Sequence, residues 1–160
     1  MLLKNKVAII TGAASGIGKS IAAAFAKEGA KVAIADINLD AAEKTAKEIG
    51  SSAIAVKVDV SDISSAEEMA EKVEKESGPL DILVNNAGVS YIIPFLECSQ
   101  DILDKTIDIN LKGTFNCCQA VLKRMAPRKN GVVINMSSQS GKSGNSHYTA
   151  YCASKFGIIG

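Results

Sequence analysis

Five short apolar runs recur along the chain, and each is followed by a polar ending. The runs cover Val7–Ile10, Lys31–Ala35, Ala53–Val58, Asp81–Val84 and Val132–Asn135. Their cores are near-continuous Val, Ile, Leu and Ala and do not alternate with polar residues, which is typical of strands buried on both faces. Because segments with a helical pattern separate these runs, the chain predicts an α/β fold in which helices cover a parallel sheet on both sides.

Capping and stop signals bound the helices between the strands. The expected helices begin at Lys19, with Gly29 near the end, and then cover Asn38–Ile49, Ser65–Ser77, Ser99–Met125 and Thr149–Gly160. No repeat or low-complexity linker interrupts the pattern, and 160 residues suffice for one buried core. We therefore predict a single domain over residues 1–160.

A glycine turn joins the first strand to the first helix in the stretch VAIITGAASGIG, residues 7–18. Such a turn points backbone N–H groups and the positive end of a helix at one spot, and its missing Cβ atoms let a pyrophosphate approach. The spacing G-x-x-x-G-x-G differs from the G-x-G-x-x-G usual at dinucleotide sites. By itself, the turn is also compatible with a simple tight connection.

The polar endings of the strands are expected to meet at one edge of the sheet. Ligands of open parallel sheets bind outside the carboxyl ends of the strands. The groups that follow the five strands are the Gly12–Gly18 turn, Asp36, Asp59, Asn85-Asn86 and Ser138. Their shared edge is the predicted site.

Asp36 lies eighteen residues after Gly18, close to the interval at which a carboxylate accepts from the adenosine ribose hydroxyls of NAD. A carboxylate there would repel the 2′-phosphate of NADP, and the neighbours Ser15 and Ile37 are not basic. NAD is therefore favoured over NADP. Asp59 is equally compatible with a role in its own turn.

Tyr151 and Lys155 are four residues apart at the start of a helix, so they share a face. A phenol is a poor base at neutral pH, but a nearby ammonium stabilises the phenolate. The pair can then exchange a proton with an alcohol, and Ser138 follows the fifth strand to the same edge, where its hydroxyl can hold a substrate oxygen. A Y-x-x-x-K pattern alone is common in helices, and it is Ser138 together with Tyr151 and Lys155 that indicates this chemistry.

These motifs together resemble the short-chain dehydrogenase/reductase family. The matching segments are TGAASGIG at 11–18, NNAG at 85–88, Asn110 within DINL, and YCASK at 151–155 with Ser138 thirteen residues upstream. The resemblance implies a Rossmann-like doubly wound parallel sheet with five strands in the order 3-2-1-4-5. Family members continue past the last helix seen here, so we expect the C-terminal strands to be missing and the chain to be a piece, or the ordered part, of a longer protein.

The resemblance also implies a role for each matched residue. Tyr151 would be the general acid/base, Lys155 would stabilise its phenolate and hold the nicotinamide ribose, and Ser138 would orient the substrate oxygen. Asn110 would hold a water that relays protons through Lys155. The implied cofactor-binding residues are Gly12, Ser15, Gly16, Ile17, Gly18, Asp36, Asp59, Val60, Asn86, Ala87, Gly88, Tyr151 and Lys155.

The expected reaction is hydride transfer between NAD and a secondary alcohol or ketone. The VAIADIN stretch and the QSGKSG loop look like those of family members that act on sugar alcohols or small diols. Two alternatives stay open: a 3-oxoacyl-thioester reductase of the same family, and a dinucleotide-binding sensor without turnover. The resemblance further implies a homo-oligomer, either a dimer or a tetramer.

Composition and charge exclude several other classes of function. With 47% hydrophobic and 22% charged residues the chain has a globular profile, and a net charge of +1 with scattered basic residues gives no sign of nucleic acid or membrane binding. No apolar run has the length of a membrane span or a signal-peptide core, so we expect a cytoplasmic protein. The four cysteines lack C-x-x-C spacing and His147 is the single histidine, so no metal site is expected. Roles for Lys142, His147 and Tyr148 stay undecided.

Overall fold

Five parallel strands form the centre of the computed structural model, which describes residues 1–160. The strands are β1 (Val7–Thr11), β2 (Lys31–Asp36), β3 (Ala53–Lys57), β4 (Ile82–Asn85) and β5 (Val132–Asn135). They lie in the order β3-β2-β1-β4-β5, and each neighbouring pair is parallel. The predicted fold class and strand order are thus confirmed.

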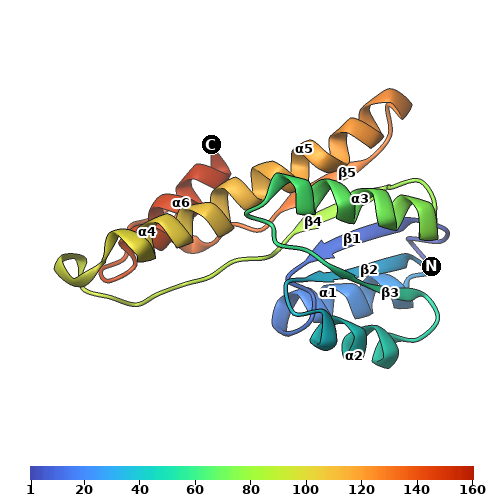
Figure 1. Ribbon diagram of the computed structural model, residues 1–160, viewed down its shortest axis with the longest axis horizontal. Coiled ribbons are helices and arrows are strands. Elements are labelled where there is room, and N and C mark those ends of the chain that lie inside the picture. The colour runs from blue at the N-terminus through green and yellow to red at the C-terminus, as the bar shows by residue number, and fades with distance from the viewer.

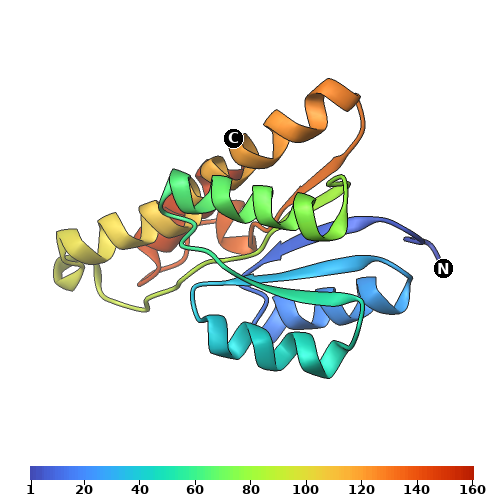
Figure 2. The same ribbon diagram turned by 45° about the vertical axis from the view of Figure 1, so that its right-hand side comes forward.

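Helices cover both faces of this sheet (Figure 1). On one face lie α1 (Gly16–Lys27) and α2 (Leu39–Ile49), and on the other lie α3 (Ile63–Ser77) and α5 (Gly113–Met125); Figure 2 shows the same two layers from another side. Side chains of a strand alternate between the faces. Ala8 and Ile10 of β1 therefore belong to the core under α1 and α2, whereas Val7 and Ile9 belong to the core under α3 and α5.

The region predicted as one helix over Ser99–Met125 is helical throughout but not uniform. It consists of α4 (Gln100–Ile107), a π-helical turn at Asp108–Lys112, and α5. The π turn contains Asn110, and such turns are frequent at functional sites. The last helix, α6 (Thr149–Ile159), packs beside α4, at the opposite end of the molecule from the N-terminus (Figure 1).

Several element boundaries differ from the prediction by a few residues. Helix α1 begins at Gly16, not at Lys19, because the last glycines of the turn already belong to its first turn. Helix α3 begins at Ile63, not at Ser65, because the Asp62 carboxylate accepts from the Ser64 N–H and caps the helix. No helix combines the length and the apolar character needed to cross a bilayer.

Candidate functional site

A cleft of about 250 Å³ opens at the carboxyl ends of β1 to β4. Predicted cofactor residues make up much of its lining, namely Gly12, Ser15, Asp36, Asp59, Val60, Ala87 and Gly88. Four apolar residues that were not predicted to bind the cofactor complete it, namely Ile37, Val58, Val89 and Ile109. Ile109 comes from the π turn, which no sequence pattern revealed, whereas Ile37 and Val58 stand next to predicted residues.

The three glycines of the turn are needed for different reasons. Gly12 (φ +63°) and Gly16 (φ +56°) adopt the left-handed conformation that favours glycine. A Cβ on Gly16 would meet nothing within 4 Å, so the backbone there lies open to a ligand. A Cβ on Gly18 would collide with the Gly12 carbonyl oxygen, so Gly18 is required by close packing.

Asp36, the last residue of β2, holds the turn in place. One carboxylate oxygen accepts from the Ala14 N–H at 3.0 Å, and the other accepts from the Asn38 N–H at 3.1 Å. A carboxylate oxygen can accept more than one hydrogen bond, so both keep capacity for ribose hydroxyls. No lysine or arginine lines the cleft beside Asp36.

Asp59 lines the cleft and also stabilises its own turn. Its Oδ1 accepts from the Ser61 N–H at 3.0 Å and from the Ser61 hydroxyl at 2.6 Å. The turn role considered from the sequence is therefore real, and Asp59 still faces the cleft.

The NNAG segment joins neighbouring strands. The Asn86 amide donates to the carbonyl oxygens of Thr11 (2.9 Å) and Gly12 (3.1 Å), and Asn86 is not among the residues that line the cleft. The buried Asn85 donates to Asn135 Oδ1 of β5 at 2.8 Å. These two side chains brace the sheet edge, and a direct contact of Asn86 with a cofactor stays a prediction.

Lys155 is the most buried charged group near the cleft, at 5% exposure. Its Nζ donates to the Met136 carbonyl oxygen at 2.8 Å and lies 5.6 Å from the ring centroid of Tyr151. Burial lowers the pKa of Lys155 because it penalises the charged form. A Cβ on Gly88 would lie 3.8 Å from this Nζ, so the Lys155 ammonium adjoins the cleft that Gly88 lines.

Ser138 follows β5 and caps a short 3₁₀ turn at Gln139–Gly141. Its Oγ accepts from the Ser140 N–H at 3.2 Å. One lone pair of the hydroxyl is thereby engaged, which leaves its proton free to donate to a ligand oxygen. Ser138 also lines a shallow depression together with Lys142 and Ile159.

The fully buried Asn110 links the loop after β4 to α6. Its Oδ1 accepts from the Val89 N–H at 2.8 Å, and its Nδ2 donates to the Val89 carbonyl at 2.9 Å and to Ser154 Oγ at 3.0 Å. Ser154 Oγ in turn donates to the Tyr151 carbonyl at 2.7 Å. Both N–H bonds of the amide are engaged, and the Asn110 main-chain carbonyl accepts from the Thr114 hydroxyl at 2.8 Å. The water expected at Asn110 stays a prediction. Ser154 stands inside the YCASK motif, yet its pattern gave no signal of this contact.

Comparison with known proteins adds to this geometry. The family model described as short chain dehydrogenase matches residues 6–160. The chain belongs to this family. It is 46% identical to D-threitol dehydrogenase of Mycolicibacterium smegmatis and 47% identical to galactitol 2-dehydrogenase of Agrobacterium fabrum, and each match covers 99% of this chain and 62% of the relative. It is also 42% identical to the 3-oxoacyl-[acyl-carrier-protein] reductase of Thermotoga maritima, over 100% of this chain and 66% of that protein.

Short-chain dehydrogenases are oxidoreductases that depend on a nicotinamide dinucleotide. The cleft of this family member fits the adenosine and pyrophosphate part of such a cofactor. The Ser15 N–H has no acceptor within the chain, and the backbone at Gly16 is open. Two carboxylates stand where ribose hydroxyls and an adenine amine, which are hydrogen-bond donors, can bind.

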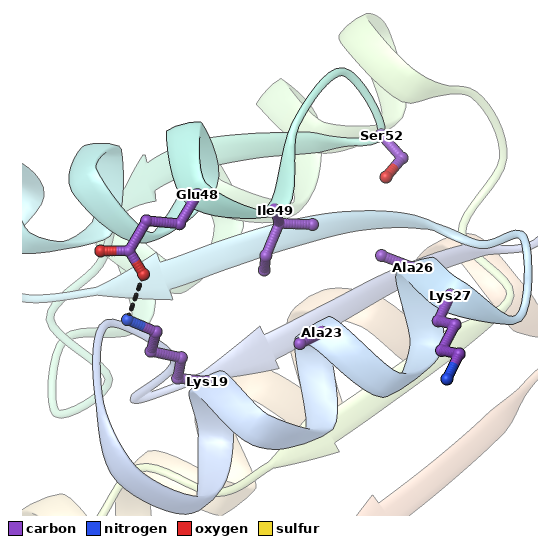
Figure 3. Close-up of a pocket in the computed structure, with 7 residues that line it drawn as sticks. All are labelled: Lys19, Ala23, Ala26, Lys27, Glu48, Ile49 and Ser52. Carbon is purple, nitrogen blue, oxygen red and sulfur yellow. Dashed lines mark hydrogen bonds and ion pairs between the residues drawn. The ribbon is translucent and has the colours of Figure 1, made fainter.

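A second depression lies between α1 and α2 of this short-chain dehydrogenase (Figure 3). It contains none of the predicted site residues. Two of its charges, Lys19 and Glu48, pair with each other at 2.5 Å, and Lys27 is the remaining charged residue of its lining. The cleft at the strand ends, in contrast, is lined by seven of the predicted cofactor residues, and it is the candidate site.

Proposed function

We propose that this chain is the dinucleotide-binding part of an NAD-dependent oxidoreductase that acts on a secondary alcohol or its ketone. One observation supports this most directly. The buried Lys155 ammonium lies beside the Tyr151 ring and 3.8 Å from where a Cβ on Gly88 would stand, at the edge of the cleft. A proton-exchanging pair thus borders a cleft suited to a dinucleotide.

In this proposal the strand ends hold NAD in two regions. Asp36 would accept from the adenosine ribose hydroxyls, Asp59 would meet the adenine amine, and the N–H groups of the glycine turn would bind the pyrophosphate. Val60, Ala87 and Gly88 would flank the cofactor, and Lys155 would hold the nicotinamide ribose.

NAD, when bound, supplies a carbon that accepts hydride from the alcohol or returns it to the ketone. Tyr151 would take the hydroxyl proton during oxidation and give it back during reduction. Lys155 would favour the phenolate through its positive charge, and Ser138 would donate to the substrate oxygen and orient it. Asn110 would hold α6 against the loop after β4 through its hydrogen bonds to Val89 and Ser154.

Asp36 favours NAD over NADP. A 2′-phosphate bound there would approach this carboxylate, and no lysine or arginine in the cleft would offset the repulsion. Asp36 holds the turn through the Ala14 N–H, so its side chain is restrained from moving away.

A sugar alcohol or small diol is the proposed substrate, by analogy with the polyol relatives described above. The similarity to a 3-oxoacyl reductase favours a second candidate, reduction of a 3-oxoacyl thioester. That reaction would normally be expected to use NADPH, so tighter binding of NADPH than of NADH would favour the reductase. Turnover of polyols, diols and 3-hydroxyacyl thioesters with NAD then separates the substrate classes.

Replacing Tyr151 by phenylalanine in the full-length protein tests the chemistry. We expect turnover to fall at least about a hundredfold, because the proton-exchanging hydroxyl is lost, while NADH binding changes little. Tyr148→Phe is the matched control, since the Tyr148 ring lies beside that of Tyr151, with centroids 6.1 Å apart and planes tilted by 59°, but has no lysine partner. Full activity of Tyr151→Phe would refute the assignment, and an inactive wild-type protein that binds NADH would support a non-catalytic sensor.

The proposal includes a cytoplasmic location and a homodimer or homotetramer. Phe115 and Leu122 on α5 support the assembly, because they are 69% and 45% exposed and stand seven residues apart on one helix face.

A further inference from the structure

Thr45 lies on α2, outside every motif discussed above, and is 2% exposed. Its hydroxyl donates to the carbonyl oxygen of Ala14 at 2.8 Å, across 31 residues of sequence. Ala14 belongs to the glycine turn and immediately precedes Ser15, the N-cap of α1. A residue from the second helix therefore contacts the backbone of the cofactor turn.

Ala14 is held on both of its backbone groups. Its N–H donates to Asp36 Oδ2 at 3.0 Å, and its carbonyl accepts from Thr45. The Ala14 carbonyl and the Ser15 N–H belong to one trans peptide unit, so they point in opposite directions. By drawing the carbonyl toward α2, Thr45 turns the Ser15 N–H away from α2.

The Ser15 N–H has no acceptor within the chain, and Ser15 lines the cleft. An N–H group at the start of a helix is suited to an anion such as a pyrophosphate. The orientation of this donor thus depends on a hydroxyl that makes no contact with the cleft itself.

A second contact joins the face of α2 that carries Thr45 to the start of α1. Glu48 stands three residues after Thr45, so the two share a face of α2, and Glu48 pairs with Lys19 at 2.5 Å (Figure 3). Lys19 lowers the pKa of Glu48 through this hydrogen bond. The pair is exposed and adds little stability, so it accompanies the Thr45 contact and does not by itself hold α2 in place.

We infer that Thr45 is a positioning residue of the dinucleotide site, which orients the Ser15 N–H toward the pyrophosphate of the cofactor by binding the Ala14 carbonyl. This inference rests on the proposed function. Beyond that function, it assigns the Ser15 N–H as a donor to the cofactor and Thr45 as the side chain that orients this donor.

The test compares isosteric variants in the full-length protein, with NADH, ADP-ribose and adenosine as probes. Thr45→Val removes only the hydroxyl and is expected to raise the Kd for NADH and ADP-ribose about tenfold. Adenosine lacks the pyrophosphate, so its Kd should change less than threefold. In kinetics, KM for NAD should rise while kcat and KM for the alcohol stay near wild-type values.

Thr106→Val is the matched control. Thr106 is 1% exposed and its hydroxyl donates to the Ile102 carbonyl at 2.6 Å on α4, away from the cofactor turn. Thr106→Val also removes a threonine hydroxyl bound to a backbone carbonyl, but one four residues away in the same helix. Thr45→Val should therefore unfold at lower urea concentration than Thr106→Val, and only Thr45→Val should weaken NADH binding. Thr45→Ser keeps the hydroxyl and should bind NADH within about threefold of wild type, and Thr45→Ala repeats the test if the valine variant does not fold.

The outcomes separate this inference from the proposed function. If wild type binds NADH and Thr45→Val weakens binding no more than Thr106→Val does, the inference is overturned and the proposed function stands. An equal loss of adenosine and ADP-ribose affinity would also overturn it, since the effect would then not concern the pyrophosphate. If wild type binds neither NADH nor NADPH, the proposed function fails and the inference fails with it.

Discussion

Replacing Asp36 by alanine is expected to shift cofactor preference toward NADPH by at least about tenfold. The side chain lies at the end of β2, lines the cleft and is half-buried. Its removal deletes the charge that would face a 2′-phosphate and the acceptor that would bind ribose hydroxyls.

The magnitude follows from charge and distance. A phosphate monoester carries about −1.5 to −2 charges at pH 7, and at about 5 Å from a carboxylate in water-like surroundings each charge contributes about 0.8 kcal/mol of repulsion. The total of roughly 1.2 to 1.7 kcal/mol corresponds to about tenfold in Kd. Loss of the ribose hydrogen bonds weakens NADH binding further, so the full shift lies between about tenfold and a hundredfold.

The assay is titration of the full-length protein with NADH and NADPH, and the measured quantity is the ratio of the two Kd values. Asp36→Ala also frees the Ala14 N–H and loosens the turn, but this weakens both dinucleotides alike and cancels in the ratio. The charge part of the shift should shrink in high salt, because exposed charges are screened.

Asp40→Ala is the matched control. Asp40 is an exposed carboxylate in the first turn of α2 and does not line the cleft. Asp40→Ala removes one carboxylate charge, as Asp36→Ala does, but outside the cleft, so its ratio should stay within about twofold of wild type. An Asp36→Ala ratio equal to that of wild type or of Asp40→Ala would refute the reasoning on cofactor choice.

Two further predictions concern stability. Burial lowers the pKa of Lys155 in the folded state. Between this lowered pKa and the unfolded value of about 10.4, the unfolded chain binds more protons than the folded one. The contribution of Lys155 to the free energy of unfolding therefore rises with pH in that range. In urea unfolding, the free energy of unfolding of Lys155→Met should therefore fall further below that of wild type at pH 10 than at pH 7. The exposed Lys142→Met is the control. A wild-type-to-Lys155→Met difference that is the same at both pH values would contradict this. Gly18→Ala should lower the free energy of unfolding by about 1 to 3 kcal/mol, because its Cβ would collide with the Gly12 carbonyl oxygen. Gly144→Ala, whose Cβ would meet nothing within 4 Å, should change it by less than about 0.5 kcal/mol. Equal urea midpoints for the two variants would argue against the packing role of Gly18.

The strands and their polar endings were accessible from the sequence. Runs such as Val7–Ile10 are apolar on both faces because helices cover both sides of the sheet, and that pattern is local. The placement of Asp36, Asp59 and the glycine turn around one cleft then followed from the parallel arrangement of the strands.

The interior of the long helical region was not accessible. The π turn at Asp108–Lys112 contains neither glycine nor proline to signal a break, so the sequence predicted a continuous helix. The different duties of Gly16 and Gly18 were hidden for a related reason. Gly16 is needed for its backbone conformation, and Gly18 is needed because a neighbouring segment lies too close for a Cβ. The sequence shows only a glycine at each position.

The sequence by itself determined the class of fold, the order of its elements and the residues that end each strand, because these depend on periodicity and on neighbours along the chain. Only the tertiary structure decided which donors meet which acceptors. Thr45 with Ala14 and Asn110 with Ser154 are separated by 31 and 44 residues. Their hydrogen bonds exist only once the packed core has brought those backbones together, and no local pattern encodes such a meeting.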